Sequence, residues 1–185
     1  TPMLTSEALS QLLKHHHEGG FTASVLTAEH PDPTGYGRIV RADDDSLLRI
    51  VEERDADDTE RDIYEVNSGV YAFDAAKLAV AIGKLKSNNS QGELYLTDVI
   101  EILRNEGGTI AAVMIDDFIE ILGVNDRVQL AESAALLRDR INEDLMREGV
   151  SIIDPLNTWV DSTATVASDV TLMPGTAISG STTIA

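Results

Sequence analysis

The sequence predicts an α/β layer structure, followed by a long helix and the start of a parallel β-helix. Three observations predict this fold class. Segments typical of strands and helices alternate between residues 5 and 122, which favours helices packed on a sheet. Residues 127–148 have the pattern of one long amphipathic helix. Beyond Pro155, helix patterns end and an aliphatic residue recurs at every sixth position.

The first predicted elements are a helix and a strand. Thr5 can cap the helix and Gly19-Gly20 can end it. Between them, apolar or aromatic side chains share one face: Leu9, Leu12, Leu13 and His16. Residues 22–27 then predict a strand.

A hairpin follows the loop at residues 31–37. Residues 38–41 and 47–51 have strand patterns, and the acidic segment 43–46 between them predicts a turn. The sequence next predicts a charged loop at residues 55–62 and a strand at residues 63–73. A helix at residues 75–85 and a polar loop at residues 87–92 follow. Thr97 can cap a helix ending near Gly107-Gly108, and two more strands are predicted at residues 109–115 and 118–122.

The predicted long helix and the repeat complete the chain. In the helix, apolar residues recur at steps of four and three: Leu130, Ala134, Leu137, Ile141 and Leu145. In the repeat, the sixth positions are Val160, Val166, Leu172, Ile178 and Ile184. Such hexapeptides form β-helices in which three units make one triangular coil, and an ordinary strand pair is the alternative. With fewer than two coils, we expect this end to be weakly stable alone or covered by neighbouring chains.

Composition excludes several classes of protein. The 185 residues contain no cysteine, which excludes disulfides and thiolate metal sites. A net charge of -18 argues against nucleic-acid binding, which depends on Lys and Arg. No apolar run approaches the ~20 residues of a membrane helix. The chain also opens without a signal-peptide pattern, so no membrane partner and a cytoplasmic location are expected.

Two polar groupings have the chemistry of a sugar site. Glycines in Gly35-Tyr36-Gly37-Arg38 would let the backbone approach a ligand closely, although a plain loop also uses glycine. Glu52 ends the predicted hairpin, and Asn67 lies within an otherwise apolar strand. A carboxylate and an amide together offer acceptors and donors to sugar hydroxyls. The alternative for Asn67 is a buried structural amide.

A third grouping, Gly123-Val124-Asn125-Asp126, directly precedes the long helix. Asn125 could cap that helix, or its side-chain oxygen could bind Mg²⁺, which prefers oxygen ligands. The run His15-His16-His17 lies in a helical pattern, where three consecutive side chains fan out and cannot share one metal. The sequence contains no GxGxxG motif or P-loop, and no Ser/His/Asp arrangement is recognisable.

Several stretches, in order, resemble the bacterial bifunctional UDP-N-acetylglucosamine pyrophosphorylase / glucosamine-1-phosphate N-acetyltransferase. They are Gly35-Tyr36-Gly37-Arg38-Ile39-Val40, Ile50-Val51-Glu52, Glu65-Val66-Asn67-Ser68-Gly69-Val70-Tyr71, Asn88-Asn89-Ser90-Gln91-Gly92-Glu93-Leu94-Tyr95-Leu96-Thr97-Asp98 and Gly123-Val124-Asn125-Asp126-Arg127-Val128-Gln129-Leu130. The resemblance covers essentially the whole chain and is carried by the ordered set rather than by one motif. Asp126 departs from it, because many relatives carry Asn there.

The resemblance implies a domain organisation. Residues 1–126 would be the C-terminal part of a Rossmann-like nucleotidyltransferase domain with a mixed sheet. Residues 127–149 would be a linker helix, and residues 150–185 the start of a left-handed parallel β-helix that carries acetyltransferase activity.

The resemblance also implies an activity. The enzyme would form UDP-N-acetylglucosamine and pyrophosphate from N-acetylglucosamine-1-phosphate and UTP, and would acetylate glucosamine-1-phosphate with acetyl-CoA, for cell-wall synthesis. The Gly37 backbone and the side chains of Glu52 and Asn67 would hold the acetylated sugar. Asn125 would contribute to UDP-N-acetylglucosamine binding and ligate Mg²⁺. These four residues are expected to converge on one pocket, and β-helices of this family associate as homotrimers.

The resemblance places other parts of the site outside this sequence. The Gly-rich phosphate loop, the uracil-binding residues and an aspartate that shares the metal would precede Thr1, and the acetyltransferase residues would follow Ala185. The chain alone is therefore expected to be inactive, or to need another polypeptide. Two alternatives stay open: a different sugar-1-phosphate nucleotidyltransferase, such as a glucose-1-phosphate uridylyl- or adenylyltransferase, or a non-catalytic trimerising module.

Overall fold

A computed structural model describes all residues from Thr1 to Ala185. The chain forms two compact units, Thr1–Gly123 (unit 1) and Val124–Ala185 (unit 2), and each is described by itself. The long helix belongs to unit 2, together with the repeat segment.

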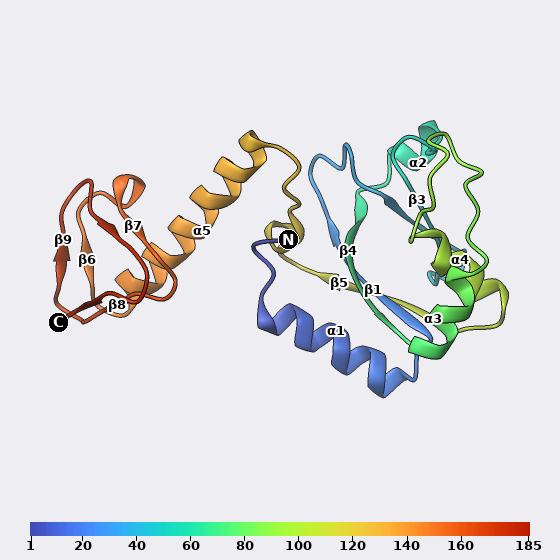
Figure 1. The fold of residues 1–185 in the computed structure, drawn as a ribbon, viewed down its shortest axis with the longest axis horizontal. Coiled ribbons are helices and arrows are strands. Elements are labelled where there is room, and N and C mark those ends of the chain that lie inside the picture. Colours follow the sequence, from blue (N-terminus) through green and yellow to red (C-terminus); the bar gives the residue numbers. More distant parts are fainter. The chain divides into compact units, whose positions relative to one another are not determined.

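Unit 1 is built on one mixed sheet (Figure 1). Its strands are β1 (Ala23–Glu29), β2 (Arg38–Arg41), β3 (Leu47–Val51), β4 (Glu65–Phe73) and β5 (Ile110–Ile115). They lie in the order β3-β2-β4-β1-β5. Only β1 and β5 run parallel, and the other neighbours are antiparallel. The α/β class and the mixed sheet predicted from the sequence are therefore confirmed.

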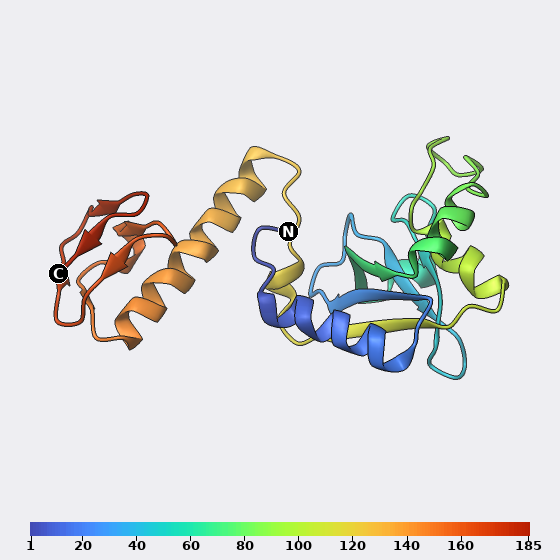
Figure 2. The ribbon, with the colours of Figure 1, turned by 60° about the horizontal axis from the view of Figure 1, so that its bottom comes forward.

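Helices cover both faces of this sheet (Figure 2). On one face, Ala8 and Leu12 of α1 (Ser6–Gly19) pack against β1, β4 and β5. On the other, α3 (Ala75–Ile82) and α4 (Asp98–Asn105) pack against β1, β2 and β3. Strand β1 is covered from both sides, so all of its residues except Glu29 are buried, including Ser24 and Thr27.

The ends of α1 follow the sequence prediction. The Thr5 side chain accepts a hydrogen bond from the Ala8 amide, and Gly20 takes the left-handed conformation with φ 60°. Its amide donates to the carbonyls of His16 and His17. Thr5 also donates to Glu120, so the cap is fixed to a distant part of the sequence.

Two predictions of secondary structure are wrong. Residues 118–122 do not form a strand: Phe118–Ile121 is a 3₁₀ helix (η1), because the Asp117 side chain accepts from the Ile119 amide and starts a turn. The predicted loop at residues 55–62 contains a one-turn helix, α2 (Asp58–Arg61). A reciprocal capping box between Asp57 and Glu60 forms that turn.

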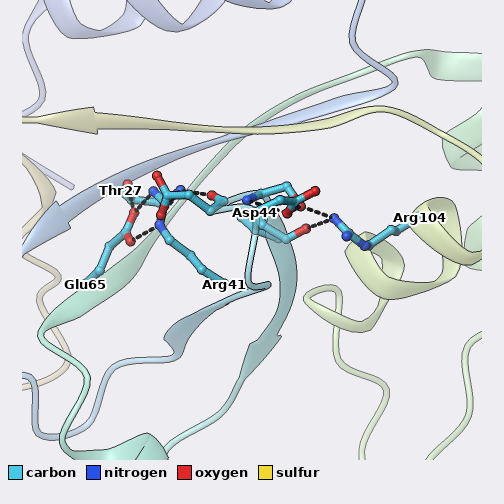
Figure 3. A network of polar contacts seen from close by, with 8 residues as sticks. Thr27, Arg41, Asp44, Glu65 and Arg104 are labelled. Atoms are coloured by element: carbon cyan, nitrogen blue, oxygen red, sulfur yellow. Dashed lines mark hydrogen bonds and ion pairs between the residues drawn. The ribbon is translucent and has the colours of Figure 1, made fainter.

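A buried polar network fixes the β2–β3 hairpin to the sheet (Figure 3). Glu65 accepts two hydrogen bonds from Arg41, at 2.7 and 2.8 Å, and one from the Thr27 hydroxyl at 2.7 Å. Arg104 of α4 reaches the hairpin turn and donates to the Ser46 hydroxyl and the Leu47 carbonyl. The hairpin is therefore fixed through strands β1 and β4 and through helix α4.

Unit 2 consists of α5 (Arg127–Arg147), a 3₁₀ turn η2 (Pro155–Asn157) and a coil of short strands. The strands are β6 (Ser151–Ile152), β7 (Trp159–Val160), β8 (Thr165–Val166), β9 (Thr171–Leu172), β10 (Ala177–Ile178) and β11 (Thr183–Ile184). We call the segment 151–185 the hexapeptide coil.

Pairing in the hexapeptide coil follows the repeat. Strand β7 pairs in parallel with β10, β8 with β11, and β6 with β9. Val160 therefore lies beside Ile178, and Val166 beside Ile184, three hexapeptides further along the chain. The repeated aliphatic side chains share one core, against which Ile141 and Leu145 of α5 pack. The predicted coil of three units per turn matches this pairing.

An asparagine attaches α5 to the coil. Asn142 is only 1% exposed, and its amide nitrogen donates to the carbonyls of Pro155 and Thr158 at 2.9 Å. Pro155 and Thr158 lie in a turn without strand pairing, so no backbone N–H of a neighbouring strand reaches their carbonyls. The Asn142 side chain donates to them instead.

Candidate functional site

Strand register brings three of the predicted site residues together. In the antiparallel ladders, Arg38 pairs with Val51 on β3 and with Val66 on β4. One step outward, Gly37 therefore lies between Glu52 and Asn67. The backbone N–H of Asn67 donates to the Gly37 carbonyl at 2.8 Å, which fixes this alignment. The site lies where the β2–β3 hairpin joins β4.

The missing side chain of Gly37 leaves space in this group. A Cβ placed on Gly37 would lie 3.4 Å from Glu52 Oε2, 3.6 Å from Asn67 Cβ and 3.2 Å from a methyl carbon of Ile50. Gly37 has no left-handed backbone conformation to require glycine. The glycine is therefore explained by the close approach of neighbouring groups, as expected for a backbone that a ligand can reach.

The amide group of Asn67 has a defined orientation. Its Oδ1 accepts from the Gly69 amide at 3.0 Å and from the Tyr71 hydroxyl at 2.9 Å. A backbone N–H can only donate, so the oxygen must be the atom that faces Gly69. The Nδ2 group makes no hydrogen bond within the chain, and it can donate to an external acceptor. The protein thus satisfies the Oδ1 atom of Asn67, and the Nδ2 group is available to a ligand.

Glu52 is held by a threonine that the sequence assigned to another role. Thr97 precedes α4 but has helical backbone angles and makes no capping hydrogen bond. Its buried hydroxyl instead donates to Glu52 Oε1 at 2.9 Å. The predicted cap is wrong, and Thr97 belongs to the site. Oε2 stays directed at Gly37, so one oxygen of Glu52 is used by the protein and the other faces the space beside Gly37.

Electrostatics around Glu52 oppose additional negative charge. Burial raises the pKa of Asp98, and repulsion from Glu101, Glu52 and Asp55 adds to that rise. The pKa of Tyr71 is also raised, mainly by burial, with a smaller contribution from Glu52. Tyr71 therefore stays a neutral hydrogen-bond donor to Asn67 across the physiological pH range.

A cavity of about 290 Å³ adjoins Glu52. It is lined by Gly35, Glu52, Glu53, Arg54 and Gln91. Arg54 donates to Gln91 at 2.7 Å, which brings the polar loop after α3 to the end of β3. The cavity thus has carboxylates, a guanidinium, an amide and exposed glycine backbone, a set suited to a polar ligand.

Asn125 lies in unit 2, directly before α5. Of the two roles considered for Asn125, the structure contradicts that of helix cap, because Asp126 is the N-cap and accepts from the Gln129 amide at 2.8 Å. The Asn125 amide donates to the Gln129 side chain at 2.7 Å, and the Asn125 side chain is exposed. No group of three or more His, Asp or Glu side chains is arranged to hold a metal ion. No helix is both long and apolar enough to span a bilayer.

Three contributors to the site were not predicted as such from the sequence: Thr97, Tyr71 and Glu53. Tyr71 lies four residues after Asn67 on one strand, a spacing that places both side chains on the same face when the pleat is regular. Thr97 and Glu53 gave no such signal, because their partners are distant in sequence or were assigned to a loop.

Comparison with known proteins places these features in a family. Residues 3–162 match the family described as nucleotidyl transferase. Bifunctional protein GlmU from Geobacillus thermodenitrificans is 48% identical over 184 residues, which cover 100% of this chain and 40% of that protein. GlmU proteins from Corynebacterium diphtheriae and Bacillus subtilis are 50% and 47% identical, with 38% and 40% of their lengths covered. The chain thus spans about 40% of the length of these curated relatives.

A solved structure agrees at the level of fold. It is assigned as a glucose-1-phosphate thymidylyltransferase from Bacillus anthracis in complex with sucrose, and it superposes with a TM-score of 0.51 at 22% identity. The match covers 69% of this chain and 48% of the other. The resemblance drawn from the ordered sequence stretches is therefore confirmed, and the chain belongs to the nucleotidyl transferase family.

Proposed function

We propose that this chain is part of a uridylyltransferase that forms UDP-N-acetylglucosamine and pyrophosphate from N-acetylglucosamine-1-phosphate and UTP. The enzyme is bifunctional, and it also acetylates glucosamine-1-phosphate with acetyl-CoA. The observation that carries the proposal is the alignment of Gly37 between Glu52 and Asn67 in a nucleotidyl transferase fold. Relatives named bifunctional protein GlmU support the choice of reaction.

The three aligned residues suit an acetylated amino sugar. Glu52 Oε2, which faces the space beside Gly37, accepts from a sugar hydroxyl. Asn67 Nδ2 donates to an oxygen of the sugar or of its acetamide group. The Gly37 carbonyl already accepts a hydrogen bond from the backbone N–H of Asn67. The backbone N–H of Gly37 is therefore the group that would donate to the ligand. Transfer of a nucleotidyl group depends mainly on such positioning of the reacting phosphate.

Asn125 is proposed as a ligand of Mg²⁺. Asn125 is exposed, does not cap α5 and has a side-chain oxygen that makes no hydrogen bond in the structure. Mg²⁺ is usually held by one or two protein oxygens, with water and phosphate completing its shell, so one amide oxygen is a compatible ligand. When bound, the ion neutralises phosphate charge. Asn125 also contributes to binding of UDP-N-acetylglucosamine in this proposal.

The hexapeptide coil is proposed to be the start of a left-handed parallel β-helix that belongs to the acetyltransferase part. Its parallel pairing at intervals of three hexapeptides supports this assignment. Residues 1–126, 127–149 and 150–185 then correspond to the nucleotidyltransferase portion, a linker helix and the β-helix start. Association as a homotrimer through the β-helix and a cytoplasmic location complete the proposal.

Ligand selectivity tests the proposed substrate. In the complete encoded protein, saturating UDP-N-acetylglucosamine is expected to raise the thermal midpoint, since a ligand at 100 times its Kd adds about 2.7 kcal/mol. UDP-glucose and ADP-glucose at the same concentration should produce less than about a third of that shift, because they lack the acetamide group. Equal protection by a glucose nucleotide would favour a different sugar-1-phosphate nucleotidyltransferase. Protection by none of them would favour a non-catalytic trimerising module.

Substitution of Asn125 tests the metal assignment. Asn125→Ala is expected to lower Mg²⁺-dependent uridylyl transfer by about a hundredfold, a typical loss for a metal-site residue. Acetyl transfer by the same preparation should stay unchanged. Asn125→Asp, which keeps an oxygen at the same position, should retain more activity than Asn125→Ala. The apparent affinity for Mg²⁺ measured in the uridylyl assay distinguishes a ligand from a residue that only shapes the loop. Unchanged uridylyl transfer would exclude the metal role.

A further inference from the structure

One carboxylate ties the glycine loop before β2 to the end of β3. Glu53 Oε2 accepts from Arg38 Nη2 at 2.7 Å and from the Gly35 amide at 3.2 Å. Arg38 also donates to the Tyr36 carbonyl. The chain from Gly35 to Arg38 is thus held at three points, and Gly37 lies between the last two. We call the contacts of Glu53 with Arg38 and Gly35 the Glu53 clamp.

Burial makes the clamp dependent on charge. The Arg38 side chain is 2% exposed, and its Nε has no hydrogen-bond partner. Glu53, which is 29% exposed, is the carboxylate that compensates this buried cation. Burial of Glu53 opposes its ionisation, but hydrogen bonds from Arg38 and Gly35 outweigh that effect and lower its pKa. Removing one member of such a pair leaves a charge that the interior cannot solvate.

The first part of the loop has contacts of its own. Gly35 is in the left-handed region at φ 86°, and the Tyr36 amide donates to the Pro33 carbonyl, which closes a turn. The Tyr36 ring lies beside His30, with centroids 5.1 Å apart. None of these contacts reaches Glu52 or its strand. Glu53 therefore adds a side-chain link to the ladder pairing of Arg38 with Val51 and to the hydrogen bond that the Gly37 carbonyl accepts from the Asn67 backbone amide.

Sequence position next to β2 and β3 connects the clamp to the site. Glu53 directly follows Glu52, and Arg38 directly follows Gly37. An ion pair between residues 38 and 53 therefore fixes the separation of residues 37 and 52, which face each other one step away. We propose that Arg38 and Glu53 are positioning residues that set the spacing between the Gly37 backbone and the Glu52 carboxylate. This proposal rests on the proposed function, because that spacing matters only if a sugar binds there.

Variants at Glu53 test the clamp with two independent readouts. In Glu53→Ala, the Gly35 amide should exchange with solvent about tenfold faster, because a charge-assisted hydrogen bond has been lost. The KM for N-acetylglucosamine-1-phosphate of the complete encoded protein should rise about tenfold, whereas kcat and the KM for UTP should change less than about twofold. Glu53→Gln keeps an acceptor for Gly35 and Arg38 but removes the countercharge of the buried Arg38, so it should restore only part of both properties.

Matched variants keep the test decisive. Glu106→Ala breaks an exposed ion pair with Lys84 elsewhere in unit 1 and should change neither readout. If Glu53→Ala does not fold, Glu53→Asp retains the charge beside Arg38 but withdraws the oxygen from Gly35, and it should show the same changes at smaller amplitude. Unchanged amide exchange in these variants, or faster exchange with an unchanged sugar KM, would overturn the proposal.

The two proposals fail in different ways. If the complete encoded protein without substitutions shows no binding of N-acetylglucosamine-1-phosphate by calorimetry, both the proposed function and the positioning role are wrong. If the parent protein binds the sugar phosphate and the Glu53 variants bind it equally well, only the positioning role is wrong. The amide-exchange readout separately reports whether Glu53 holds the loop.

Discussion

Replacing Glu65 by alanine is expected to destabilise unit 1 by about 3 kcal/mol, the lower part of the range for breaking a buried ion pair. The Glu65 side chain is 9% exposed and accepts three hydrogen bonds, two from Arg41 and one from Thr27. Alanine would leave the Arg41 cation and the buried Thr27 hydroxyl without this partner. Urea unfolding followed by far-ultraviolet circular dichroism measures the change. Tryptophan fluorescence does not suit this purpose, because the single tryptophan, Trp159, lies in unit 2.

Two further variants separate charge from shape at this position. Glu65→Gln retains one acceptor oxygen and should cost about half as much as alanine, since a neutral hydrogen bond replaces a charge-assisted one. Glu106→Ala removes an exposed carboxylate of unit 1 and should cost less than about 1 kcal/mol. A Glu65→Ala protein as stable as the Glu106→Ala protein would show that the network in Figure 3 does not stabilise the hairpin.

Gly37→Ala is expected to reduce binding of N-acetylglucosamine-1-phosphate by about a hundredfold while the fold is kept, because a methyl group occupies space that the ligand needs. The new Cβ would meet Glu52 Oε2 at 3.4 Å and Ile50 at 3.2 Å. The contact with Ile50 is tight, so this side chain must shift by a few tenths of an ångström, but Gly37 does not have a positive φ and alanine can adopt its backbone conformation. Calorimetric titration of the complete encoded protein with the sugar phosphate measures the affinity.

A second glycine provides the control. Gly83 follows α3, has no positive φ, and would place a Cβ 3.4 Å from the Val80 carbonyl, an ordinary contact. Gly83→Ala should leave the affinity for the sugar phosphate unchanged. Equal affinities in the Gly37 and Gly83 variants would mean that no ligand approaches the backbone at Gly37, and the proposed sugar site would be wrong.

Local patterns predicted most elements of the fold. The cap at Thr5, the end at Gly20 and the hairpin at residues 38–51 depend on neighbours a few residues apart, and the structure confirms them. The hexapeptide repeat likewise predicted a core of aliphatic residues. The strand expected at residues 118–122 was wrong, because an apolar run suits a strand, whereas the Asp117 side chain accepts a hydrogen bond from the Ile119 amide and starts a 3₁₀ turn.

The site shows what sequence reasoning could not reach. Gly37, Glu52 and Asn67 were named from residue chemistry and family resemblance, and their alignment follows from a register that no local pattern encodes. Thr97 was assigned to a cap because the same residue type serves both caps and side-chain contacts, and only the tertiary structure shows that Glu52 receives its hydroxyl. Asn125 was considered as the cap of α5 from its residue type and position, but the structure uses the next residue, Asp126.

The pairing pattern of the hexapeptide coil has a consequence for how unit 2 folds. Strands β7 and β8 pair with the strands three hexapeptides further along, β6 pairs with β9, and Ile141 and Leu145 of α5 cover part of the same core. Stability in such an array is approximately a sum of terms between adjacent layers. Order should therefore spread layer by layer from the helix, as in a one-dimensional zipper. A destabilising substitution in one layer would therefore disturb the layers farther from α5 more than the layers between it and α5.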